Sequence, residues 1–278
     1  MTLRTLALGR KTIRVDADTP RIARRGLRSL AILEPIAGAR ELDVSNNDLR
    51  SLRDMPRMPN LRTLHLTGNR LADVEGIARV APALHTLYAG HIADPSGLAR
   101  LRHLRVLMLA TGERDLRFLQ RSSVGYLAID APLRSLNGLE RLTNLGELVV
   151  HGAKLARLTE ISHRKLWKLI MPDCGLRSIP RLTTPALQIL FLYDNPITEM
   201  GDLGKAPKVG DLQLENTKIR TLEGLERLHN LHHLNIPGRT ITRITATTDR
   251  NLRGLSDLAL RTGSTRSYAV FAARRTIS

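Results

Sequence analysis

Leucines recur along this chain at a lag of 20 to 24 residues, and no other feature restricts its fold as strongly. Each copy reads LxxLxL, then two free positions and a ninth position of restricted chemistry, most clearly at residues 61–69, 187–195 and 209–217. A single copy cannot bury its own leucines, so the copies must stack against one another. Eleven copies begin at Ala39, Leu61, Leu84, Leu104, Val124, Leu145, Leu166, Leu187, Val209, Leu231 and Leu255.

The two halves of each copy predict different local structures. The Leu-x-Leu alternation predicts a strand with one buried face, because successive side chains of a strand point to opposite sides. The return segment, for example residues 219–228, spaces its apolar residues as helical or 3₁₀ turns do. The sequence therefore predicts an α/β repeat solenoid, with a parallel sheet on one side and short helical segments on the other.

This repeat resembles the leucine-rich repeat family, in the class shared by the phosphatase-1 regulatory subunit and the bacterial internalins. The resemblance covers about residues 39–262, and the duplicated return segments 138–144 and 224–230 add to it. It implies a curved, right-handed horseshoe with a concave parallel sheet and a convex side of short helical or 3₁₀ segments. We expect one continuous domain, in which residues 1–38 form an N-terminal cap with degenerate repeats and residues 263–278 form a C-terminal cap.

The ninth position of the family holds an asparagine whose amide satisfies backbone groups in a buried ladder. Here that asparagine remains at Asn47, Asn69 and Asn195, and we expect Cys174 and Thr217 to substitute for it. Other copies carry residues that cannot do so, namely Ala131 or Pro132, Ala153 and Arg239. The copies from Leu84 and Leu104 are the hardest to align, which predicts a local irregularity there.

The two ends of the chain allow more than one interpretation. Residues 12–15 and 267–272 alternate like edge strands among arginines, which blunt edge pairing. The first 15 residues have four basic side chains and no acid, a composition also found in organelle-import segments. Because residues 3–8 already match the repeat, we favour a capping strand over a targeting segment.

Composition limits the environment and the partners. The formal net charge is +17, and 36 of the 43 basic residues are arginine, which binds phosphate or carboxylate bidentately. No apolar run approaches a membrane span, and no secretory signal is seen. We expect a soluble, intracellular protein; a mitochondrial matrix location is compatible with this composition, and secretion is disfavoured.

The repeat register divides this charge between two surfaces. The second, third, fifth, seventh and eighth positions should face the concave side, where they place nine acidic and five basic residues. The concave face thus carries about −4 and the remainder of the chain about +21. An acidic partner, RNA or protein, is therefore expected on the convex side or caps. The arginines singled out for that contact are Arg21, Arg24, Arg25, Arg28, Arg274 and Arg275.

Aromatic and apolar residues show the opposite segregation and gather on the concave positions. Exposed contiguous apolar area usually marks a partner site, although an open sheet face also favours such residues. We interpret the stripe as a protein-binding surface because an acidic fringe borders one side of it. The candidate contact residues are Tyr88, Met108, Tyr126, Val149, Trp167, Ile170, Asp173, Phe191, Tyr193, Asp194 and Glu215.

The acidic fringe consists of Asp173 and Asp194 in the eighth position and Glu215 in the seventh. Like charges at strand spacing repel, and a cationic partner or solvent must neutralise them. We hypothesise that a partner inserts an Arg or Lys here while its apolar side chains pack on the stripe. A metal ion is disfavoured because the neighbouring positions offer no matching His or Cys.

Catalytic motifs are missing from the sequence: it has no phosphate-binding glycine loop, GxSxG, HExxH, CxxC or EF-hand pattern. We therefore predict a non-enzymatic protein without cofactor, metal or small-molecule substrate.

Three functions remain after this exclusion. The first is a scaffold, a subunit or adaptor of a larger assembly, that binds a protein partner on its concave face. The second is a structural subunit of a ribonucleoprotein, such as a ribosome or mitochondrial ribosome, that contacts RNA through its basic convex surface and termini. The third is a bacterial inhibitor or immunity-type protein, which the sequence neither supports nor excludes.

Overall fold

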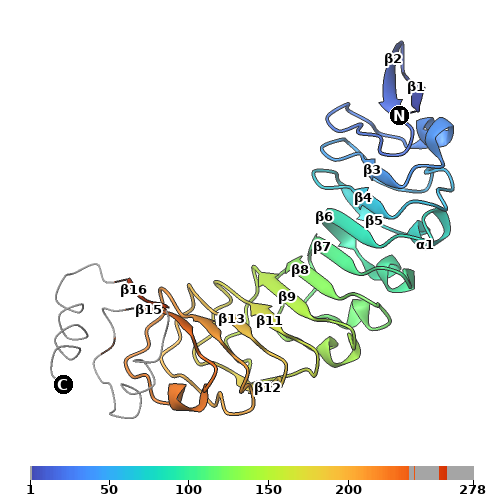
Figure 1. The fold of residues 1–278 in the computed structure, drawn as a ribbon. Coiled ribbons are helices and arrows are strands. Elements are labelled where there is room, and N and C mark those ends of the chain that lie inside the picture. The colour runs from blue at the N-terminus through green and yellow to red at the C-terminus, as the bar shows by residue number, and fades with distance from the viewer. Residues whose placement is uncertain (1, 238–240, 242–256, 262–278) are drawn as a thin grey trace. The chain divides into compact units, whose positions relative to one another are not determined.

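A computed structural model describes residues 2–237, 241 and 257–261 (Figure 1). The chain divides into two compact units, each considered by itself below. Unit 1 comprises residues 1–132 and 136–145, and unit 2 comprises residues 133–135 and 146–278. The expected C-terminal cap, residues 263–278, lies outside the described residues, and the expected domain boundaries stay predictions.

The strands of unit 1 are parallel and follow the predicted copies. They are β3 (Glu41–Asp43), β4 (Thr63–His65), β6 (Thr86–Asp94), β7 (Val106–Thr111) and β8 (Tyr126–Asp130), each paired with the next. A further strand, β5 (Leu71–Asp73), pairs with the end of β6. The register between β6 and β7 shifts between Tyr88 and Gly90, which is the irregularity that the short copies predicted.

Unit 2 continues the same construction. Its strands are β9 (Glu147–His151), β11 (Lys168–Ile170), β13 (Ile189–Phe191), β14 (Asp211–Gln213), β15 (His233–Pro237) and β16 (Asp257–Arg261), again parallel and paired in this order. Within the described residues each of the eleven predicted copies therefore has its strand. The parallel-sheet solenoid with few helices is confirmed.

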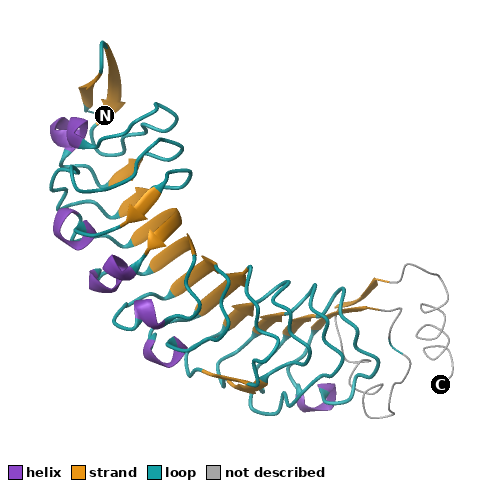
Figure 2. Cartoon of the chain, turned by 180° about the vertical axis from the view of Figure 1, so that it is seen from behind, coloured by secondary structure: helices purple, strands orange, loops and turns teal. Residues whose placement is uncertain are grey.

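The return segments are short turns, as predicted. In the part of the chain that the structure describes, they contain one α-helical turn, α1 (Ile77–Val80), and the 3₁₀ segments η2 (Ser96–Arg100), η3 (Arg117–Leu119), η4 (Leu139–Arg141) and η5 (Leu225–Arg227). Figure 2 shows these helices beside the strands, joined to them by loops. Two return segments of unit 2 are instead extended and pair with each other as β10 (Glu160–Ser162) and β12 (Arg181–Thr183).

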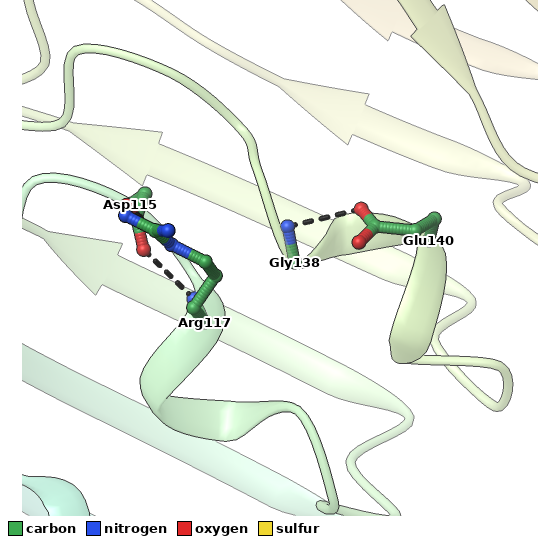
Figure 3. Close-up of polar contacts among 4 residues, drawn as sticks. All are labelled: Asp115, Arg117, Gly138 and Glu140. Carbon is green, nitrogen blue, oxygen red and sulfur yellow. Dashed lines mark hydrogen bonds and ion pairs between the residues drawn. The ribbon is translucent and has the colours of Figure 1, made fainter.

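The duplicated return segments share one cap, which explains their sequence. Gly138 and Gly224 both precede a 3₁₀ turn in a left-handed conformation, at φ 98° and 102°. The backbone N–H of each donates to the glutamate two residues later, at 2.9 Å for Glu140 and 2.8 Å for Glu226. The neighbouring turn uses an aspartate instead, since the N–H of Arg117 donates to Asp115 at 3.0 Å (Figure 3).

The core is a column of leucines contributed by successive copies. Leu64, Leu87, Leu107 and Leu127 occupy the same position of adjacent strands in unit 1, and all four are fully buried. Each buried leucine contributes roughly 1.5–3 kcal/mol relative to an exposed one. The repeated leucine of the sequence therefore supplies the stacking energy that one copy alone lacks.

The N-terminal segment forms a hairpin rather than a repeat strand. Strands β1 (Leu3–Leu8) and β2 (Lys11–Asp16) pair antiparallel, and β1 packs against η1 (Ala31–Ile36). Between β2 and the first predicted copy, the chain already makes one coil of the solenoid. The N–H of Ile22 donates to the carbonyl of Asp43 at 2.7 Å, as a strand neighbour does. This coil lies within residues 1–38, where the sequence analysis placed degenerate repeats.

The asparagine ladder is present and carries the predicted hydrogen bonds. In Asn47 the side-chain oxygen accepts the N–H of Arg25 and of Leu27, and its amide donates to the carbonyl of Ile22. Thr217 substitutes with a single bond, its hydroxyl donating to the carbonyl of Leu214 at 2.7 Å.

Cys174 occupies the same position and is fully buried. Its thiol donates to the carbonyls of Pro172 and Val150 at 3.3 Å and 3.6 Å. Burial raises the pKa of the Cys174 thiol to about 12, against a hydrogen bond from Ala153 that lowers it. The thiol is therefore a structural group, as the sequence predicted.

Candidate protein-interaction surface

In unit 2 a row of apolar residues runs across three adjacent strands. Ile170 of β11 stands directly opposite Val149 of β9 and Phe191 of β13. All three side chains are half-buried and lie on the sheet face, since the apolar residues immediately before and after each of them are fully buried in the core. Side chains opposite each other on neighbouring strands are about 5 Å apart, so the three form one continuous apolar strip.

Trp167 and Tyr193 flank this row from the two ends of the strands, and both are half-buried. The ammonium of Lys168 lies 5.9 Å from the Trp167 ring centre, close enough for a cation–π contact. The same ammonium pairs with Glu147 on the adjacent strand at 3.6 Å. The five predicted apolar residues of unit 2 thus lie on three adjacent strands or directly beside them in the chain, and we call them the unit 2 patch.

The acidic fringe lies beside the unit 2 patch, but backbone conformation restricts the residue type at two of its three positions. Asp173 and Asp194 are exposed, with φ 46° and 59°, in the left-handed region. The same eighth position is left-handed in other copies, where it holds an asparagine or a glycine, namely Asn46, Gly68, Gly152 and Asn216. Asp, Asn and Gly are the residues that tolerate this conformation. The left-handed backbone therefore explains why this position holds Asp, Asn or Gly. Only the use of Asp rather than Asn or Gly is evidence for binding.

Two of the fringe carboxylates also accept hydrogen bonds from side chains of this chain. The amide of Asn216 donates to Asp194 at 2.7 Å, and the amide of Asn235 donates to Glu215 at 3.3 Å. Both donors are neutral, so the negative charge remains. The fringe keeps the charge needed to attract a basic side chain.

The candidate residues Tyr88, Met108 and Tyr126 form a separate group in unit 1. They stand on the adjacent strands β6, β7 and β8, and Tyr88 lies opposite Met108. Met108 is 40% exposed, one of the two large hydrophobic residues classed as exposed in the described chain. The ring of His65 stacks on Tyr88 with 4.5 Å between ring centres, which covers part of the tyrosine. The apolar and aromatic stripe that the sequence predicted is thus described as two groups of residues, one in each unit.

The candidate basic residues lie on the first coil. Arg21, Arg24, Arg25 and Arg28 are all exposed. Arg24 has φ 58°, a conformation that costs energy for a side chain of this type. Arg274 and Arg275 lie outside the described residues.

One feature of unit 2 has no counterpart in the sequence reasoning. An open hollow of about 600 Å³ is lined by Gln188, Ile189, Lys208, Gly210, Asp211, Asn230 and His232. Burial raises the pKa of Asp211, opposed by the nearby His233 and His232. The Nε2 of His233 lies 3.9 Å from the Asp211 carboxylate. The repeat register places Asp211 and His233 on adjacent strands. The partial burial of Asp211, however, depends on the turns around it.

Within the described ranges no group of three or more His, Cys, Asp or Glu side chains is placed to hold a metal ion. No helix in the same part of the chain is long and apolar enough to cross a membrane.

Parallel strands, buried leucines and an asparagine ladder together define a repeat solenoid. Residues 40–79 match the family model of leucine-rich repeats, in two copies. Residues 40–79 thus match the leucine-rich repeats that the sequence predicted.

Similar proteins come from several kinds of organism. A protein phosphatase 1 regulatory inhibitor subunit PPP1R7 homolog of Arabidopsis thaliana is 24% identical over 198 residues, covering 69% of this chain and 49% of that protein. A U2 small nuclear ribonucleoprotein A' of Emericella nidulans is 39% identical over 82 residues, covering 28% of this chain and 35% of that protein. The chain thus spans about half or less of the curated relatives it matches.

Among solved structures, an internalin of Listeria monocytogenes has the same fold. Its TM-score is 0.54 at 18% identity, and the match covers 85% of this chain and 78% of the internalin.

Proposed function

We propose that this protein is a non-enzymatic scaffold that binds a protein partner on the sheet face of unit 2. The partner would pack apolar side chains on the unit 2 patch and place an Arg or Lys beside the acidic fringe. The protein would serve as a subunit or adaptor of a larger assembly.

The observation that carries this proposal is the strip formed by Val149, Ile170 and Phe191. Three half-buried apolar side chains in direct register, extended by a tryptophan and a tyrosine, offer the kind of surface that interfaces concentrate. The names of the two curated relatives, a regulatory subunit and a small nuclear ribonucleoprotein component, support a role within assemblies.

Alanine replacement of Phe191 and Tyr193 tests the proposal. We expect the double variant to bind a crosslinked and identified partner at least about tenfold more weakly, because interface aromatics commonly contribute 2 kcal/mol or more each. Lys154→Ala/Arg157→Ala is the control, since both side chains are exposed and lie outside the strands. Thermal unfolding of each variant separates lost contact from lost fold. Unchanged affinity of a folded Phe191→Ala/Tyr193→Ala variant contradicts the proposal.

A second candidate function is a ribonucleoprotein subunit that contacts RNA through Arg21, Arg24, Arg25 and Arg28. Four exposed arginines within eight residues favour it, because phosphate neutralisation needs density of charge rather than a motif. If this function holds, the logarithm of RNA affinity falls linearly and steeply with the logarithm of salt concentration. A protein contact through the unit 2 patch should respond much less to salt.

A further inference from the structure

In unit 1 one position of the return segment is an arginine in five successive copies. The series is Arg57, Arg79, Arg100, Arg121 and Arg141, at spacings of 20 to 22 residues. All five side chains are exposed. Arg79 lies in α1, and Arg100 and Arg141 are the last residues of η2 and η4. Figure 2 shows these short helices following one another along unit 1.

Packing between the copies brings the series into one row. The N–H of Met58 donates to the carbonyl of Val80 at 2.7 Å, so the residues after Arg57 and Arg79 are direct neighbours. Further along, α1 packs against η2 and η2 against η3. Arginines that are distant in sequence therefore lie one coil apart.

A second row of basic residues, Arg40, Arg62, His85 and Arg105, lies just before β3, β4, β6 and β7. The N–H of Arg62 donates to the carbonyl of Arg40 at 2.7 Å, that of His85 to Arg62 at 2.9 Å, and that of Arg105 to His85 at 2.8 Å. All four side chains are exposed. Because each bond joins one copy to the next, the second row is continuous as well.

The turns between the two rows carry no acid. We call these turns the arginine ridge; they are residues 57–62, 79–85, 100–105, 121–125 and 141–145, and they contain eight arginines and no Asp or Glu. Their leucine, valine and methionine side chains are all buried. The exposed side chains of the ridge are thus arginine, histidine and small or neutral polar residues.

Little of this positive charge is compensated. Arg141 pairs with Glu140 at 3.7 Å, but both side chains are mostly exposed, and such pairs are weak. Arg100 borders a hollow lined by Asp73, Glu75 and Asp94, with no ion pair among the contacts of the described chain. In the same part of the chain Arg57, Arg79 and Arg121 have no ion-pair partner.

The corresponding position in unit 2 is different. Four residues before each copy of unit 2 stand Ser162, Thr183, Lys205 and Arg227. Arg227 donates to Asp202 at 2.8 Å. Lysines replace most arginines in the adjoining turns, at Lys165, Lys205 and Lys208. An uninterrupted row of arginines is therefore a property of unit 1.

We propose that the arginine ridge binds the phosphodiester backbone of a single nucleic-acid strand. Five copies at about 4.8 Å each give a row of at least about 19 Å, long enough to face several consecutive phosphates of an extended strand. Guanidinium groups bind phosphates bidentately. A protein partner would need apolar anchors, and those of the ridge are buried. The ridge has no Phe, Tyr or Trp, and its two histidines, His85 and His103, stack on each other with 6.0 Å between ring centres. We therefore expect contacts to the phosphates rather than base stacking, and recognition that is independent of sequence.

This inference rests on the second candidate function and assigns it a different site. The test measures binding of fluorescently labelled single-stranded RNA and of DNA of the same mixed sequence to the full chain, between about 50 and 200 mM salt. The ridge variant is Arg57→Gln/Arg79→Gln/Arg121→Gln. A control with the same loss of charge is Arg157→Gln/Arg177→Gln/Lys218→Gln, at exposed positions of unit 2. A third variant, Arg21→Gln/Arg25→Gln/Arg28→Gln, removes the basic end.

We expect the ridge variant to bind both strands about 50-fold more weakly at 0.15 M salt, about fourfold for each lost phosphate contact, with a salt slope smaller by about two. The control should lose less than threefold. Equal losses in the ridge variant and the control overturn the proposal, since net charge alone then explains binding.

The remaining outcomes separate this inference from the function on which it rests. Loss in the basic-end variant alone overturns the ridge and leaves the ribonucleoprotein function standing. Binding of neither strand by the unaltered protein overturns both. If the ridge arginines are needed for a polyglutamate peptide and not for nucleic acid, the occupant is an acidic protein and the proposal is wrong.

Discussion

The side-chain oxygen of Asn195 accepts the backbone N–H of Cys174 at 2.9 Å, so two residues at the same position of consecutive copies hold each other in place. The same oxygen accepts the N–H of Leu176 at 3.0 Å, and the amide group donates to the carbonyls of Met171 and Leu192. Asn195 is 1% exposed, so water cannot replace these bonds. The ladder joins copies through backbone groups that would otherwise be buried without a partner.

Asn195→Ala should lower the free energy of unfolding by about 3 kcal/mol or more, because each buried polar group left without its partner costs roughly 1–3 kcal/mol. Urea unfolding followed by circular dichroism measures the change. Asn60→Ala, at an exposed position, should change it by less than about 0.5 kcal/mol. Equal effects of the two substitutions would contradict the ladder.

Cys174 should give the protein a pH-dependent stability in the alkaline range. Its folded pKa of about 12 lies above the unfolded value of about 8.5, so the folded state holds the proton more tightly. The stabilisation is complete below about pH 8.5 and is lost as the pH rises toward 12.

Urea midpoints of the unaltered protein and of Cys174→Ala, measured from pH 7.5 to 10, test this expectation. The difference between the two proteins should shrink as the pH rises, while other titrating groups cancel in the comparison. A difference that does not depend on pH would show that the thiol ionises in the folded state as it does in the unfolded chain.

The two glycine caps should differ in their tolerance of a side chain. Both need a left-handed backbone, which costs an alanine about 1–2 kcal/mol. At Gly138 a Cβ would also lie 2.7 Å from the backbone of Leu116 and Arg117, whereas at Gly224 the nearest atom would be 3.4 Å away. Gly138→Ala should therefore destabilise by a further 1–3 kcal/mol or so. The ranking is read from thermal or urea unfolding, and a reversed order would refute it.

Asp211→Asn should stabilise the protein at neutral pH. Burial raises the folded pKa of Asp211 above its unfolded value of about 3.9, so its contribution to stability is present below that value and lost as the pH rises through the folded pKa. The neutral amide avoids this loss. Unfolding midpoints at pH 3 and pH 7 check the prediction: the gain should vanish at pH 3, and Asp130→Asn, at an exposed position, should show no such change.

Much of the candidate surface could be derived from the repeat register. Ile170 and Phe191 occupy the same position of their copies, and parallel pairing then places them side by side without further information. The buried role of Cys174 followed in the same way. The asparagines at the same position of other copies indicated which hydrogen bonds the thiol must replace.

Other parts of the surface depended on backbone conformation. The eighth position appeared in the sequence as an acidic fringe at Asp173 and Asp194, but the structure shows a left-handed residue there in several copies. The alternation of Asp, Asn and Gly at that position was the signal that would have revealed it. The shared position of Arg57 and Arg79 was visible too, but only their packing showed that the two form part of one exposed row.

By itself the sequence determined the repeating unit, the buried column of leucines, the asparagine ladder and which strand residues face outward. These properties are local and repeated, so each copy confirms the pattern of the others. Tertiary structure alone decided the N-terminal hairpin, the division into two units and the alignment of the arginine ridge. The hairpin pairs two neighbouring segments outside the regular copies. The other features depend on hydrogen bonds and packing between segments about 20 residues apart, which the spacing of residues within one copy does not specify.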